Sequence, residues 1–188
     1  MDDLLMTECS TSTHDQQPFF RIGDLEQRGI SLRQLRLVVS EMDKRCENEG
    51  WVSVIDAKRG ERLTPKTVTL YDLCDYMIVP DTCQRSCSYV ELIADRKQPP
   101  DWYVSHWWGE YVHRLLDCLS THAEDEGLGE DVVYWVCAFA NRQHDQGEMG
   151  FTMLEDSPCM RVLRACKVSP CLLAVRGHGR GRRRRCMA

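Results

Sequence analysis

The sequence predicts an α/β protein with an incomplete parallel sheet of about three strands and a mainly helical N-terminal extension. Three observations lead to this prediction. A short apolar strand, an amphipathic helix and a second apolar strand follow one another between residues 102 and 139, the order expected for two parallel strands joined by a crossover helix. The apolar segment Pro170–Val175 predicts a third strand. Most segments before residue 100 favour helices and turns.

The chain divides into four predicted parts. Residues 1–18 are polar and without periodicity, which is typical of a flexible terminus. Residues 19–100 are expected to form the helical extension and residues 101–175 the α/β domain. Residues 176–188 form a basic tail that cannot bury a core. A chain of 188 residues can hold one ordinary domain, or a small domain with an extension.

The charge is distributed unevenly. Six of the 24 basic residues lie in the tail, so 18 basic and 29 acidic residues remain in the rest of the chain, a net charge of −11. An acidic body argues against a nucleic-acid-binding core. The tail alone could bind RNA or an acidic lipid surface, or remain a solvated end.

The beginning of the chain predicts a location. It lacks the basic and apolar regions of a signal peptide, and no run of residues is long and apolar enough to span a membrane. We therefore expect a cytoplasmic protein in which the 11 cysteines are mostly reduced thiols.

The first strong helix signal lies in the extension. Ser31 is a good N-cap, and Gly50 is a good stop for a helix that reaches about Asn48. Its apolar residues share one helical face, and we expect them to pack against the core: Leu32, Leu35, Val38, Val39, Met42 and Cys46.

The central unit begins with a predicted strand at Trp102–Ser105. A helix is expected to start near Glu110, where the helix dipole favours an acidic residue. The second strand, residues 132–139, is apolar at nearly every position, which is typical of an interior parallel strand covered on both faces. A polar loop over residues 140–156 and a helix from Pro158 to Lys167 should follow.

Three parallel strands would leave apolar sheet edges exposed, which proteins usually avoid. The sequence therefore suggests an α/β domain that is truncated at its C-terminus, or one whose edge is covered by a partner.

Polar and aromatic residues gather after both predicted parallel strands. Because ligands bind beyond the carboxyl ends of parallel strands, we expect a ligand or interaction site there. It would comprise Ser105, His106, Trp107, Trp108, Gly109, Glu110, Asn141, Gln143 and His144. The alternative is a purely structural role, in which the two Trp side chains cover the core and the polar residues stabilise the loops. No dinucleotide or P-loop phosphate motif is present.

Cysteine and histidine residues raise two further chemistries. Cys137 could pair with His106 or His144 as a nucleophile and its base, although a buried thiol inside an apolar strand is the simpler interpretation. Cys83 and Cys87 form one zinc-type pair, but a zinc site usually needs a second matched pair, so no metal is expected.

The two loop segments resemble a known group of domains. Residues 103–110, Y-V-S-H-W-W-G-E, resemble the opening strand and loop of TIR-like and HET-like domains, which are flavodoxin-like α/β signalling domains. Residues 135–143 resemble the HET-type segment W-I-D-x-x-C-I-N-Q. The chain is also similar to uncharacterised protist proteins with a V-S-H-W-W-G loop and a Y-W-V-C-A-F-A-N-x-Q-H strand and loop. The resemblance covers about residues 65–175.

This resemblance implies a signalling or protein-interaction module that binds a protein partner or a second copy through the α/β domain. Two departures matter: Cys137 stands where the HET pattern has Asp, and Asn141 lies one place early. No residue matches the later Glu with which enzymatic TIR domains cleave NAD, so we expect no catalysis and no cofactor. The alternative is an NAD glycohydrolase-like enzyme that takes NAD as ligand or substrate, with His106 and Glu110 as catalytic candidates.

Overall fold

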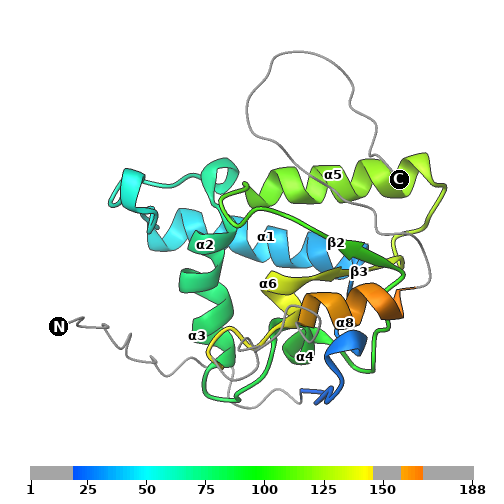
Figure 1. Ribbon diagram of the computed structural model, residues 1–188. Coiled ribbons are helices and arrows are strands. Elements are labelled where there is room, and N and C mark those ends of the chain that lie inside the picture. Colours follow the sequence, from blue (N-terminus) through cyan, green and yellow to red (C-terminus); the bar gives the residue numbers. More distant parts are fainter. Residues whose placement is uncertain (1–18, 146–157, 167–188) are drawn as a thin grey trace.

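The computed structural model describes residues 19–145 and 158–166, and this part combines helices with a small mixed sheet (Figure 1). The strand order is β1-β3-β2. Strand β2 (Trp102–Val104) pairs in parallel with β3 (Val133–Val136), whereas β1 (Ile30–Ser31) pairs antiparallel with β3. The α/β class is confirmed.

The expectation of an all-parallel sheet is wrong for the described strands. The third of them comes from the N-terminal region, where the chain crosses β3 on its way into the first long helix. The strand expected at Pro170–Val175 lies outside the described residues.

Helix α1 (Leu32–Glu49) agrees with its prediction. The Ser31 hydroxyl accepts a hydrogen bond from the Gln34 N–H, and the Gln34 side chain accepts one from the Ser31 N–H, which together form a capping box. Gly50 ends the helix in the left-handed region at φ 71°. The six apolar residues expected on one face are all buried: Leu32, Leu35, Val38, Val39, Met42 and Cys46.

Short helices fill the region between α1 and β2. They are η1 (Leu25–Gln27) before α1, and then η2 (Asp56–Lys58), η3 (Pro65–Thr67), α2 (Leu70–Leu73), the π-helical turn η4 (Cys74–Ile78), α3 (Val79–Thr82) and α4 (Tyr89–Ile93). The buried apolar residues of α2, η4 and α4 join those of α1 and the sheet in one core, whereas Leu25 of η1 lies in a second cluster. The mainly helical character expected for this region is therefore observed.

The predicted strand–helix–strand unit is present. Helix α5 (Val112–Asp125) connects β2 to β3 and starts two residues later than expected. Tyr134 and Val136 of β3 belong to the core shared with α1 and α5, whereas Trp135 packs in a second cluster with Val162. Strand β3 is thus covered on both faces, as its apolar sequence indicated.

The prediction of a strand over residues 132–139 is wrong in its second half. Strand β3 ends at Val136, and α6 (Cys137–Ala140) follows at once. Both elements are largely buried, and a continuous apolar run cannot distinguish a buried strand from a buried helical turn.

Helix α8 (Pro158–Ala165) lies near its expected position. It packs against η1, and its Val162 is fully buried beside Trp135. Among the described residues, no helix is long and apolar enough to cross a membrane.

Candidate functional site

The carboxyl ends of β2 and β3 meet at one thiol–imidazole contact. Val104 and Val136 are register partners in the parallel pair, so the residues that follow them emerge side by side. The Cys137 Sγ lies 3.7 Å from the His106 Nε2. This distance allows a hydrogen bond to sulfur, and both side chains are partly exposed. The structure therefore brings His106 of the first predicted loop to Cys137, a residue that was expected inside the second strand.

The loop after β2 is held against the segment before α2. The Glu110 carbonyl accepts a hydrogen bond from the Leu70 N–H at 3.3 Å, and the Val68 carbonyl accepts one from the Val112 N–H at 3.0 Å. Within the loop, the Trp107 carbonyl accepts the Glu110 N–H at 3.0 Å. Ser105 continues the chain from β2 into this loop and is partly buried. The C-terminal end of the loop is therefore fixed by backbone hydrogen bonds.

Three aromatic side chains lie on this loop or beside it. Trp107 is 62% exposed and Tyr71 is 45% exposed, while the Trp108 ring lies 5.6 Å from the Tyr71 ring. We call Trp107, Trp108 and Tyr71 the Trp107 patch. The Trp107 ring lies over Gly109 so closely that a Cβ at Gly109 would collide with it unless the ring moved.

Glu110 is a buried acid at the start of α5. It is 2% exposed. Its Oε1 accepts hydrogen bonds from the Tyr111 N–H and the Arg114 guanidinium, both at 3.3 Å, and its Oε2 is buried without a hydrogen-bond partner in the described structure. One carboxylate oxygen thus stabilises the helix start, which the helix dipole also favours.

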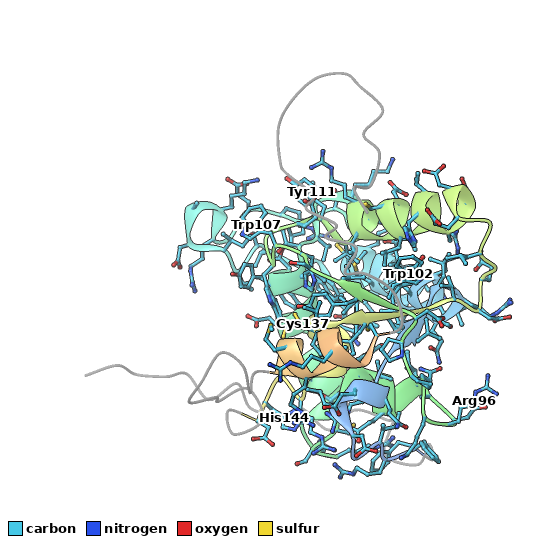
Figure 2. The ribbon with its side chains drawn as sticks, turned by 45° about the vertical axis from the view of Figure 1, so that its right-hand side comes forward. Arg96, Trp102, Trp107, Tyr111, Cys137 and His144 are labelled. Carbon is cyan, nitrogen blue, oxygen red and sulfur yellow. The ribbon has the colours of Figure 1, made fainter. Side chains whose placement is uncertain are left out.

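The loop after α6 turns away from the Trp107 patch. Figure 2 shows Trp107 and His144 on opposite sides of Cys137. The Gln143 side chain donates to the Cys137 and Ala138 carbonyls, each at 3.0 Å, and both ring nitrogens of His144 are buried. These side chains support α6 more than they line a shared cleft with the first loop.

Asn141 completes the predicted set. It is 8% exposed, and its N–H donates to the Cys137 carbonyl at 3.1 Å. Its side-chain Oδ1 is buried without a hydrogen-bond partner in the part of the chain that the structure describes. It therefore lies within the packed turn after α6.

A buried ionic network fixes this second loop, and no sequence motif predicts it. Arg142 donates to both oxygens of Glu91 in α4, at 3.1 and 3.0 Å. Glu91 is fully buried, and Arg28 lies 4.0 Å away with 1% of its surface exposed. Burial tends to raise the pKa of Glu91, but hydrogen bonds from Arg142 and from the Ser88 and Ile22 backbone lower it below the ordinary value. The three side chains come from distant segments, so no local motif could reveal them.

The electrostatics favour a neutral His106. Burial lowers its pKa below 6.5, and the nearby Val104 carbonyl opposes this shift only in part. At neutral pH the ring is therefore uncharged, and its Nε2 faces the Cys137 thiol as a possible proton acceptor.

Metal binding finds no support among residues 19–145 and 158–166, because they contain no group of three or more His, Cys, Asp or Glu arranged to hold an ion.

No family model, no curated protein and no solved structure matches this chain. The geometry of the site is therefore the basis for its interpretation.

Proposed function

We propose that this chain is a signalling or protein-interaction module of the TIR/HET-like type and that its sheet is related to that of flavodoxin-like domains. The module would bind partners through the Trp107 patch. The observation that carries the proposal is the exposure of Trp107, at 62%, on a loop fixed by backbone hydrogen bonds. Large aromatic side chains on rigid supports are common energetic centres of protein interfaces.

The geometry supports binding more than catalysis. Glu110 is buried, and one of its oxygens is already paired with Arg114 and with the start of α5. The loop after α6 diverges from the Trp107 patch (Figure 2), so the predicted residues do not enclose one reaction site. We take a second copy of the chain as the partner.

The test compares self-association of matched surface variants by sedimentation velocity over a wide concentration range. Trp107→Ala should weaken association by about 2 kcal/mol, or roughly 30-fold, as expected for an interface hot spot. Leu37→Ala is the control, because Leu37 is similarly exposed, at 66%, but lies on α1. A wild-type chain that stays monomeric, or two variants that behave alike, would contradict the proposal.

The alternative is an enzyme that cleaves NAD or a related nucleotide. Two observations favour it: the exposed Trp107 ring could stack on a base, and the buried Glu110 Oε2 has no hydrogen-bond partner among the described residues. Incubation with NAD separates the two functions. Nicotinamide release that is lost in Glu110→Gln would support the enzyme, whereas no release would leave the interaction module.

A further inference from the structure

Cys137 and His106 form a side-chain pair that the interaction module does not use. They come from the ends of two adjacent parallel strands, with their Sγ and Nε2 atoms 3.7 Å apart. Both residues are only partly buried. The contact therefore places a nitrogen base beside a nucleophilic atom on a residue that is not fully enclosed.

Three other cysteines in the described structure have raised thiol pKa values. Burial raises the pKa of Cys74 to about 12 and that of Cys87 to about 11. It also raises the pKa of Cys46, which is 1% exposed. The thiolate is the reactive form of cysteine, so these three side chains should react slowly.

We propose that Cys137 is a nucleophilic modification site for small uncharged electrophiles, with His106 as its base. The sulfur forms a bond to the electrophilic carbon while the bond from that carbon to its leaving group breaks. The leaving group departs with the electron pair, and the thiol proton moves to Nε2 of His106 and then to solvent. No oxidant or reductant is required.

The surroundings select the class of reagent. Cys137 packs against the cluster that contains Trp135, with Tyr103 beside it, and the Trp108 ring lies 6.3 Å from the His106 ring. A partly buried, aromatic environment disfavours a charged reagent, because the charge must lose hydration to enter. The neutral state of His106 at physiological pH leaves Nε2 able to accept the proton. This inference does not depend on the proposed docking function.

The test measures the rate of alkylation by iodoacetamide at each cysteine of the folded full chain at neutral pH, using peptide mass spectrometry. In the wild-type chain, Cys137 should be labelled at least about tenfold faster than Cys74 or Cys87, since a positioned base contributes this much or more. Labelling of Cys137 no faster than that of Cys74 or Cys87 would overturn the proposal without any substitution.

His106→Gln tests the role of the imidazole. Gln keeps a polar side chain but cannot accept the proton, so labelling of Cys137 should fall about tenfold. His113→Gln is the matched control, because His113 lies on α5 and pairs with Asp43, and it should leave the rate unchanged. Slow labelling of Cys46 and Cys87 in both variants would show that the fold is retained.

The two outcomes of the variant comparison are distinct. An unchanged Cys137 rate in a folded His106→Gln chain would overturn the assignment of the base. Iodoacetate carries a carboxylate and should label Cys137 more slowly than iodoacetamide, and the opposite order would contradict the proposed class of electrophile.

Discussion

Glu91→Gln should be the most informative substitution for stability. Glu91 is fully buried and accepts four hydrogen bonds: from the Ile22 N–H at 2.9 Å, the Ser88 N–H at 2.7 Å, and the Arg142 guanidinium at 3.1 and 3.0 Å. Gln has a similar shape but no charge, and its NH₂ group would face donors. The buried Arg28 and the partly buried Arg142 would then lose their common counter-charge.

The expected loss in the free energy of unfolding is about 3 kcal/mol, because removing one partner of a buried ion pair typically costs about 3–5 kcal/mol and Gln retains one acceptor oxygen. The measurement is urea denaturation at pH 7 and 25 °C. With a urea dependence of about 2 kcal/mol/M, the midpoint should fall by roughly 1.5 M. Asp131→Asn is the control, since its pair with Arg33 is 86% and 61% exposed and should contribute less than about 1 kcal/mol.

The same pair predicts a pH dependence of stability. The pKa of Glu91 in the folded chain lies below its ordinary value of 4.5, so ionisation favours the folded state. This contribution is fully present above pH 4.5 and is lost as the pH falls through the lower folded-state pKa. The wild-type chain should lose this increment in acid, whereas Glu91→Gln should lack it. A loss below about 1 kcal/mol at pH 7, or the same acid profile in both chains, would refute the reasoning.

Two further substitutions test local features. Ser31→Ala removes the N-cap of α1 and should lower the free energy of unfolding by about 1 kcal/mol, measured by urea denaturation, and a loss below about 0.3 kcal/mol would show that the capping box contributes little. Gly109→Ala should change that free energy by no more than about 0.5 kcal/mol, as at an ordinary surface site, because the obstructing atoms belong to the exposed Trp107 ring, which can swing away. Its displacement should weaken self-association as Trp107→Ala does, and unchanged association in Gly109→Ala would show that the ring position over Gly109 is not needed.

Local signals in the sequence were sufficient for the separate elements. Ser31 and Gly50 fix the ends of α1 through hydrogen bonds within a few residues of each other, so their effect is visible in a short window. The apolar character of β3 likewise indicated a strand covered on both faces. The same run failed to show where the strand ended, because Ala138 and Phe139 are as well suited to a buried helical turn as to a strand.

Contacts between distant segments were not accessible in this way. Nothing near Ile30 indicates that it pairs antiparallel with Tyr134, so the sequence predicts an all-parallel sheet. Glu91 lies 51 positions from Arg142, and each residue alone is typical of a solvent-exposed site. The loop after α6 was grouped with the loop after β2 because both follow parallel strands, but the intervening α6 turns it toward α4, where Arg142 binds Glu91.

The pairing of Cys137 with His106 shows which step from sequence to site is decisive. Strand adjacency alone brings two loops to one sheet edge, but side chains meet only in a particular register. Val104 opposes Val136 and both strands end at this pair, so the loop that carries His106 and the helix that begins with Cys137 start from the same place on the sheet edge. A register shift by one residue would move one strand end along the other by about 3.3 Å and separate the thiol from the imidazole. The reactivity of Cys137 therefore depends on the β2–β3 register as much as on the two residues, and its labelling rate reports on whether that register is maintained.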